Sequence, residues 1–233
     1  MYCSGKQLKK MEADEIIFPG MLSVLGIRSM KFENAAIAAC SASEYKDTEK
    51  KPGTQDGWRL FKQYYPLNSV WRLFDKFSVI LFADWASLAC GTDIWDGLLS
   101  EVIKPLGEKG HAFIFQLGDI TPKKAFEVDE ILCIISDFSS HGSVSLVLDK
   151  QEADSLYQLL HGMRGLTWNQ QLQKNCNNQY ASIFQSLHID QLMICMTDSI
   201  MVYQKNRQFE LAGNNGDGKE TALHAALNWR TLQ

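Results

Sequence analysis

The chain has 233 residues, of which 45% are hydrophobic and 11% aromatic, so it has the material for a substantial core. Its formal net charge of −4 argues against general affinity for nucleic acid. No apolar run approaches the ~18 residues of a membrane span, and the N-terminus lacks the apolar stretch of a secretory signal. The six cysteines form no CxxC pair, which fits a reducing compartment. We therefore expect a cytoplasmic protein that does not bind membranes.

Residues 1–50 are predicted to form an N-terminal segment that is partly helical and either packed on the rest of the chain or arm-like. Within it, the alanine-rich stretch 32–42 predicts a short helix. Residues 44–57 are charged, nearly free of hydrophobic residues and rich in turn formers, which is typical of a linker. A soft boundary near residue 50 leaves 51–233 as an α+β main domain.

Residues 58–76 contain a short internal echo, because the string WRLFK at 58–62 recurs as WRLFDK at 71–76. Pro66 lies between the copies, so we predict two short amphipathic helices. Residues 77–82 are apolar and β-prone and predict a buried strand. Thr92 is the expected cap of a helix over 93–106, which Gly107 ends, and 112–117 predict the next strand.

Residues 127–163 are predicted to form a strand–strand–helix unit. The continuous apolar run 131–135 and the alternating run 143–148 are joined by a short polar segment that contains Gly142. Two such runs suggest an antiparallel hairpin. Asp149 and Glu152 then have the spacing of a capping box, and apolar residues follow at helical spacing.

The C-terminal part predicts a second hairpin, formed by 191–196 and 200–204 around a turn at 197–199. A mostly exposed helix is expected within 168–187. A further strand at 209–212, a loop at 213–219 and a terminal helix at 221–229 complete the expected elements. Because the strands arrive in neighbouring pairs, we expect an α+β fold. Its sheet should be mainly antiparallel, of about 5–7 strands built from hairpins, with helices packed against it.

The loop from Gly213 to Lys219 has the GxxxxGK spacing of a phosphate-binding loop. In such a loop, backbone N–H groups and a helix N-terminus hold the phosphate. The hydroxyl that would bind Mg²⁺ has to follow the lysine, but this position is Glu220. A solvated turn is therefore favoured over a phosphate site.

The residue types of a hydrolytic triad occur within five positions, as Asp137, Ser139, Ser140 and His141. Neighbours in one short segment do not readily reach the geometry of a triad, which normally draws on distant segments. A polar loop is the favoured interpretation. The alternative pairs His141 with a distant carboxylate such as Asp84 or Asp119.

A magnesium site is one interpretation of Asp84, Asp93 and Asp96. Carboxylates at strand ends gather Mg²⁺, but acidic residues in a first helical turn also stabilise the helix without a ligand. The five histidines form no HxxxH pair that would indicate zinc. No metal, cofactor or catalytic residue is therefore predicted.

Charge is segregated along the chain. Residues 51–76 carry five Lys/Arg and two Asp/Glu, whereas 77–233 carry eleven Lys/Arg and eighteen Asp/Glu. Trp, Tyr and Arg are the residues enriched at the energetic centres of protein interfaces. The predicted partner-binding residues are Trp58, Arg59, Lys62, Tyr64, Tyr65, Trp71 and Arg72. Two other interpretations stay open: core helices with snorkelling cations, or a surface that stacks nucleic-acid bases.

These observations predict a non-catalytic cytosolic protein-binding module. It would be a subunit of a larger assembly, or an accessory or neutralising partner of another protein. The alternative is a hydrolase or phosphoryl-handling enzyme that uses Asp137 and His141 or the loop 213–219. Nucleic-acid contact through 58–76 is a third hypothesis and is not favoured.

Overall fold

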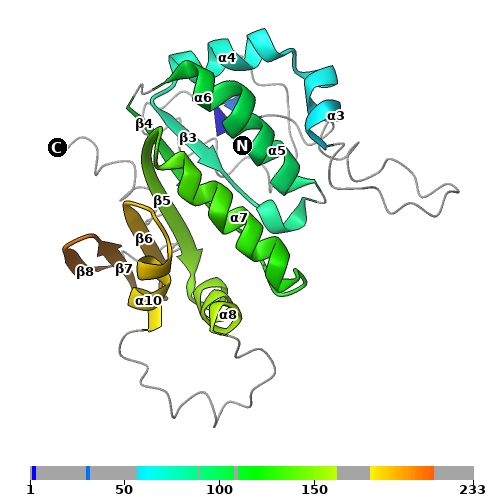
Figure 1. Cartoon of the computed structure of the whole chain (residues 1–233). Coiled ribbons are helices and arrows are strands. Elements are labelled where there is room, and N and C mark those ends of the chain that lie inside the picture. The colour runs from blue at the N-terminus through cyan, green and yellow to red at the C-terminus, as the bar shows by residue number, and fades with distance from the viewer. Residues whose placement is uncertain are drawn as a thin grey trace, which may run out of the picture.

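The centre of the fold is a series of β–α–β units whose strands run parallel (Figure 1). A computed structural model of the chain describes residues 2–3, 30–31, 57–88, 90–107, 110–161 and 179–212. The strands are β1 (Tyr2–Cys3), β2 (Met30–Lys31), β3 (Val79–Phe82), β4 (His111–Phe115), β5 (Gly142–Asp149), β6 (Gln191–Cys195), β7 (Ser199–Gln204) and β8 (Arg207–Ala212). They form one sheet in the order β2-β1-β3-β4-β5-β6-β7-β8. Strands β3 to β6 run parallel to one another, and the pairings on either side of them, β2-β1-β3 and β6-β7-β8, are antiparallel.

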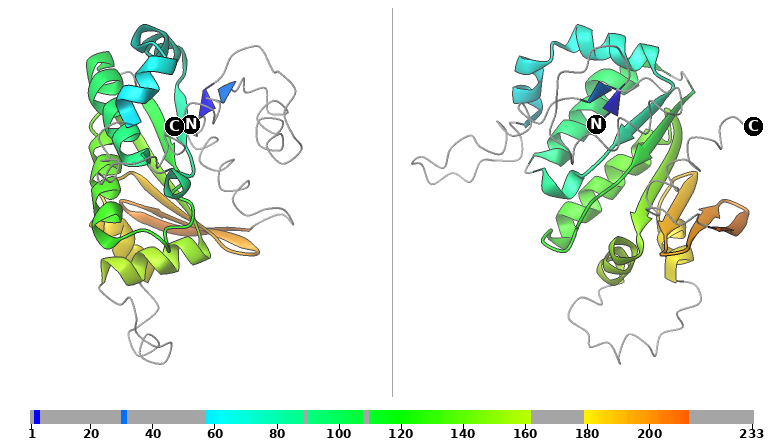
Figure 2. Two further views of the ribbon diagram at one scale, coloured as in Figure 1. Left: turned by 90° about the vertical axis from the view of Figure 1, so that its right-hand side faces the viewer. Right: turned by 180° about the vertical axis from the view of Figure 1, so that it is seen from behind.

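The crossover helices lie on one face of this sheet, as the edge-on view of Figure 2 shows for α5 and α7. The helices are α3 (Gly57–Tyr64), α4 (Leu67–Lys76), η2 (Trp85–Ser87), α5 (Gly91–Leu98), α6 (Lys104–Leu106), α7 (Ala125–Phe138), α8 (Lys150–Leu160) and α10 (Gln179–Ser186). Helix α5 continues into α6 through the π-helical turn η3 (Leu99–Ile103). Helices α3 and α4 pack on the outside of this continuous helix. None of the described helices combines the length and the apolar character of a membrane span.

The expected central hairpin is wrong, because residues 131–135 belong to helix α7. The buried positions Val128, Ile131, Leu132, Ile135 and Phe138 recur at helical spacing across this segment. A short run of β-branched residues fits a buried strand or a buried helix equally well, and here the longer helical period decides. Strand β5 therefore pairs with β4 and β6 in parallel, and the sheet is mixed and not mainly antiparallel.

Several local signals before and after that segment are confirmed, and one is wrong. Helices α3 and α4 lie on either side of Pro66, and Gly107, with φ of 70°, ends α6. The second hairpin forms as β6 and β7, and β8 follows it. Thr92 is not the helix cap, because α5 begins at Gly91 and the Thr92 hydroxyl accepts a hydrogen bond from the Trp85 indole.

The expected elements at 32–42, 213–219 and 221–229 lie outside the described residues. At the N-terminus, Tyr2 pairs with Leu81, so β1 joins the sheet beside β3. The division of the chain at residue 50 stays a prediction.

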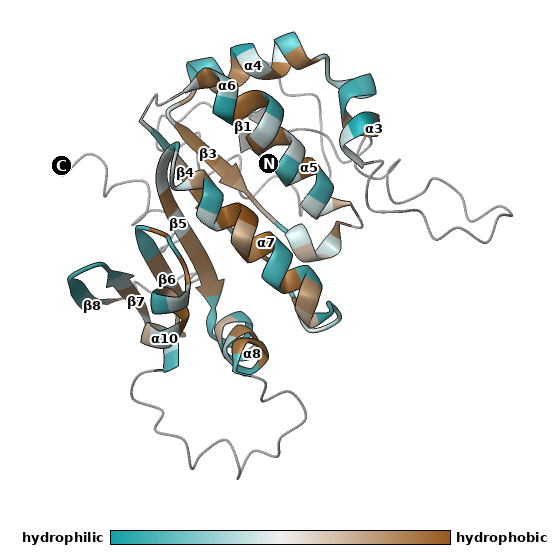
Figure 3. Cartoon of the chain, in the orientation of Figure 1, coloured by the Kyte–Doolittle hydropathy of each residue, from teal (hydrophilic) through white to brown (hydrophobic). Residues whose placement is uncertain are grey.

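Aromatic rings fill the core between the sheet and its helices. The Phe82 ring is stacked on Phe115 at 4.8 Å and meets the edge of Phe138 at 5.2 Å. The opposite face of the same strands carries a second buried cluster, which includes Leu81, Ile114 and Val147. The central strands are thus apolar on both faces, as parallel strands require, and Figure 3 shows β3 as a hydrophobic ribbon.

The capping box at the start of α8 provides a first prediction. The Asp149 carboxylate accepts a hydrogen bond from the Glu152 N–H at 2.7 Å, and the Glu152 carboxylate accepts one from the Asp149 N–H at 2.7 Å. We expect Asp149→Ala to lower the free energy of unfolding by about 1 kcal/mol, because one helix N–H loses its acceptor. Urea denaturation measures this change. The control Gln151→Ala, at an exposed position of the same turn, should stay within about 0.5 kcal/mol of wild type, and an equal loss in both variants would contradict the assignment.

Candidate functional site

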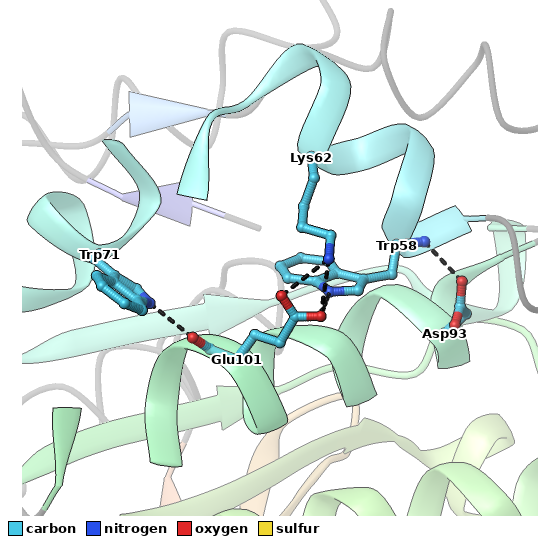
Figure 4. A network of polar contacts seen from close by, with 5 residues as sticks. All are labelled: Trp58, Lys62, Trp71, Asp93 and Glu101. Carbon is cyan, nitrogen blue, oxygen red and sulfur yellow. Dashed lines mark hydrogen bonds and ion pairs between the residues drawn. The ribbon is translucent and has the colours of Figure 1, made fainter. Parts of the chain in front are cut away.

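The two copies of the WRLF echo converge on a single residue, Glu101 (Figure 4). Trp58 of α3 donates its indole N–H to the Glu101 carboxylate at 2.6 Å. Trp71 of α4 donates its indole N–H to the Glu101 backbone carbonyl at 2.7 Å. The echo therefore has a structural meaning: each copy places a tryptophan against the same turn of the long helix. Phe61 and Phe74, the other shared aromatic positions, are both buried.

The position of Pro105 explains why the backbone carbonyl of Glu101 is available to the Trp71 indole. In an α-helix the Glu101 carbonyl would receive the N–H of residue 105, but proline has none and its ring clashes with that carbonyl. The chain widens into the π-turn η3, in which the Lys104 N–H donates to the Leu99 carbonyl. The indole of Trp71 then supplies a donor to the Glu101 carbonyl. This π-turn positions the residue that joins α3 and α4 to the domain.

An ion pair strengthens this joint, the name we use for the contacts of Trp58, Lys62 and Trp71 with Glu101. The Lys62 ammonium lies 2.9 Å from both carboxylate oxygens of Glu101 and 5.3 Å from the centre of the Trp58 ring. The hydrogen bond from Lys62, followed by the one from Trp58, lowers the pKa of Glu101 below its usual value of 4.5. At the start of α3, the Trp58 backbone N–H donates to the Asp93 carboxylate at 2.7 Å. Asp93 lies in the first turn of α5, as the sequence indicated, but its carboxylate accepts a hydrogen bond from the N-terminus of another helix, α3.

The pKa of Glu101 gives a prediction about pH. Because folding lowers this pKa, the carboxylate stabilises the fold fully above about pH 5, and the contribution is lost as the pH falls through the lowered value. We expect wild type to be more stable than Glu101→Gln at pH 7, and this difference to narrow toward pH 3. Denaturant unfolding at both pH values measures it. A difference that is the same at the two pH values would show that the ionised carboxylate does not act in this joint.

The seven predicted partner-binding residues fall into three groups. Trp58 is 7% exposed and stacks on Phe61, with ring centres 5.2 Å apart. The second group, Lys62, Tyr65 and Trp71, is half-buried. The third group, Arg59, Tyr64 and Arg72, is exposed, and Tyr64 keeps 55% of its surface accessible. We use the name Tyr64 face for these three exposed residues of α3 and α4. The sequence predicts partner binding for all seven residues, and this stays a prediction; it did not indicate which of them are buried.

Among the residues that the structure describes, the side chains proposed for hydrolysis form no hydrogen bonds to one another, although the Ser140 backbone N–H donates to the Asp137 carbonyl at 3.2 Å. Within the described residues, no hydrogen bond connects Asp137 with His141, and the Ser139 hydroxyl donates to the Ser136 carbonyl at 2.6 Å. The carboxylate of Asp84 accepts the Ser87 hydroxyl at 2.6 Å, and that of Asp119 accepts the Thr121 N–H at 2.9 Å.

No set of three His, Cys, Asp or Glu residues in the described part of the chain is arranged to hold a metal ion. The loop 213–219 lies outside the described residues. The described residues therefore show no arrangement that supports the hydrolytic hypothesis, and the phosphate hypothesis concerns residues outside them.

Asp137 instead lines a pocket of about 430 Å³ between α7 and the ends of α8 and α10, which we call the Asp137 pocket. Its lining residues are Asp129, Leu132, Cys133, Ser136, Asp137, Leu160, Ser186, Leu187 and His188. They come from three separate stretches of the chain. Sequence reasoning missed this pocket because a strand at 131–135 would send alternate side chains to opposite faces. In the helix, Asp129, Cys133 and Asp137 recur every four residues along one stripe.

The described residues thus define an α+β protein with a mixed sheet, an exposed basic and aromatic face, and a separate pocket. Comparison of the chain with protein-family models, with curated proteins and with solved structures finds no match. The argument for function therefore rests on the geometry of this chain alone.

Proposed function

We propose that the chain is a non-catalytic, cytoplasmic protein-binding module that contacts another protein through the Tyr64 face. It acts as a subunit of a larger assembly, or as an accessory or neutralising partner. The observation that carries this proposal is the joint at Glu101, which fixes α3 and α4 while leaving Arg59, Tyr64 and Arg72 exposed.

The physical argument concerns the cost of binding. A surface whose helices are already held in place loses little conformational freedom when a partner docks. Tyrosine and arginine contribute large contact areas at the centres of interfaces. The positive charge of Arg72 favours a partner with an acidic contact surface, whose approach it steers. The buried Trp58 then has a supporting role and does not touch the partner.

The experiment is affinity capture of the tagged chain from its native cytosol, followed by light-scattering mass measurement of the eluate. We expect a stoichiometric partner with wild type and its loss with Tyr64→Ala/Arg72→Glu. The control Lys205→Glu makes the same charge change on the exposed β7–β8 turn and should retain the partner. Circular dichroism checks that all three proteins are folded.

Two results would contradict the proposal. One is a monomeric eluate with wild type. The other is an identical partner with wild type and with the Tyr64→Ala/Arg72→Glu variant. Nuclease treatment distinguishes protein binding from the third hypothesis, nucleic-acid contact through 58–76. A capture that is lost with nuclease and falls steeply with salt would indicate nucleic acid bound at this face.

A further inference from the structure

The Asp137 pocket is separate from the Tyr64 face and has a charge distribution of its own. Its volume of about 430 Å³ lies within the range of small-molecule sites. Asp129 and Asp137 stand eight residues apart on one stripe of α7, which at about 1.5 Å of rise per residue separates them by roughly 12 Å along the helix. The pocket lining therefore contains two carboxylates that are well separated along the helix.

No cation inside the described part of the chain neutralises these carboxylates. Helix α7 contains no Lys or Arg, and neither Asp129 nor Asp137 forms an ion pair or hydrogen bond through its side chain with a described residue. Asp137 lies in the last turn of α7, where unpaired carbonyl groups add negative potential. Helices α8 and α10 also end in this lining, at Leu160 and Ser186. Three helix C-termini and two carboxylates thus make the pocket attractive to cations.

The remaining lining is suited to an aliphatic chain. Leu132, Leu160 and Leu187 supply apolar surface, and the Cys133 thiol lies on the stripe between the two carboxylates. The walls are also held together. In α8, Asp154 accepts hydrogen bonds from Tyr180 at 2.7 Å and from Gln179 at 3.0 Å, which joins α8 to α10.

We propose that the Asp137 pocket binds an extended aliphatic polycation of the linear polyamine class. The two terminal ammonium groups pair with Asp129 and Asp137, while the methylene segments between them lie on the leucines. This arrangement follows the behaviour of lysine side chains, which bury an aliphatic stem and keep the charged end at polar groups. A short cation reaches only one carboxylate, and an anion is repelled. The proposal is independent of the protein contact at the Tyr64 face.

Cys133 provides a reporter inside the pocket, because its thiol is exposed while Cys90 and Cys195 are buried. The full chain is treated with iodoacetamide, and the alkylation of each cysteine is followed by peptide mass spectrometry as spermidine is added. We expect spermidine to slow the alkylation of Cys133 in a saturable way. In Asp129→Asn/Asp137→Asn, the apparent Kd should rise by at least about tenfold, because two charge-assisted contacts are lost.

Matched controls separate this site from general attraction to an acidic protein. The variant Asp96→Asn/Asp198→Asn removes two exposed carboxylates outside the pocket and should bind spermidine as wild type does. Diaminooctane, which is long enough to reach both carboxylates, should protect Cys133 at lower concentration than diaminobutane. Mg²⁺ at equal ionic strength should give no comparable protection.

Any of three results would overturn the proposal. They are no protection of Cys133 by spermidine, equal protection by spermidine in the two double variants, or protection by diaminobutane or Mg²⁺ equal to that by diaminooctane. Circular dichroism and denaturant unfolding of each variant show whether a lost response reflects a lost fold. If all variants keep their fold, a protection by spermidine that weakens in Asp129→Asn/Asp137→Asn but persists in Asp96→Asn/Asp198→Asn identifies the pocket carboxylates as its cause.

Discussion

Replacing Phe82 with alanine will lower the free energy of unfolding by about 3–5 kcal/mol, the range of large aromatic truncations in cores. Phe82 has no exposed surface and lies on β3, where the crossover helices meet the sheet. Its ring contacts Trp95 of α5 at 5.4 Å and Phe138 of α7 at 5.2 Å, as well as Phe115 at 4.8 Å. Truncation leaves a cavity lined by rings from three other elements, α5, α7 and β4, which cannot all move inward together.

Urea denaturation of wild type and Phe82→Ala measures this loss. The matched control is Phe126→Ala in the first turn of α7, because the Phe126 side chain is 62% exposed. That substitution should change the free energy of unfolding by no more than about 0.5 kcal/mol. A loss below about 1.5 kcal/mol in Phe82→Ala would mean that this ring cluster does not form the centre of the core. The expected loss is a large share of the 5–15 kcal/mol that typical domains have, so binding assays should not use this variant.

Elements that depend on local chemistry could be predicted from the sequence. The capping residues Asp149 and Glu152, the break at Pro66 and the stop at Gly107 each act within a few residues of their own position. The β6–β7 hairpin is local in the same sense, since its turn joins strands that are adjacent in sequence. Such signals retain their meaning whatever the rest of the chain does.

The parallel centre of the sheet could not be predicted in this way. Its strands pair across crossovers, and the pairing of β4 with β5 depends on residues 116–141 forming a helical connection. Once 131–135 is interpreted as a strand, β5 acquires a false antiparallel neighbour and the stripe from Asp129 to Asp137 disappears. One incorrect element therefore hid both the topology and the pocket.

Composition indicated the seven residues as candidates for partner binding, which stays a prediction, but it did not indicate which of them are buried. Whether Trp58 is exposed depends on Glu101, which is 43 residues further along the chain, and on the space left by Gly97. No property of the segment 58–76 alone distinguishes an interface tryptophan from a buried one. The internal echo was the available signal, because two copies with the same spacing of tryptophan and phenylalanine are typical of two helices that pack in the same way.

Gly97→Ala will test this joint directly. Its effect on the free energy of unfolding should be a loss with Trp58 in place and a gain in a Trp58→Ala background. A Cβ atom at Gly97 would lie 2.2–2.7 Å from three ring carbons of Trp58, closer than real Cβ atoms come to other atoms. The Trp58 ring must therefore move, which disturbs its hydrogen bond to Glu101. We expect a net loss of about 1–3 kcal/mol in the free energy of unfolding, although alanine is favoured over glycine in a helix by about 1 kcal/mol.

In a Trp58→Ala background the clash is absent, so only the helix preference acts, and Gly97→Ala should raise the free energy of unfolding by up to about 1 kcal/mol. Denaturant unfolding of the four proteins of this double-mutant cycle measures the coupling between the two positions. Additive effects would show that α3 does not rest on Gly97. The Tyr64 face would then lose the rigid support on which its proposed binding role depends. A reversal of sign would show that the buried tryptophan holds this surface in place, and that partner binding should be tested at the exposed residues above it.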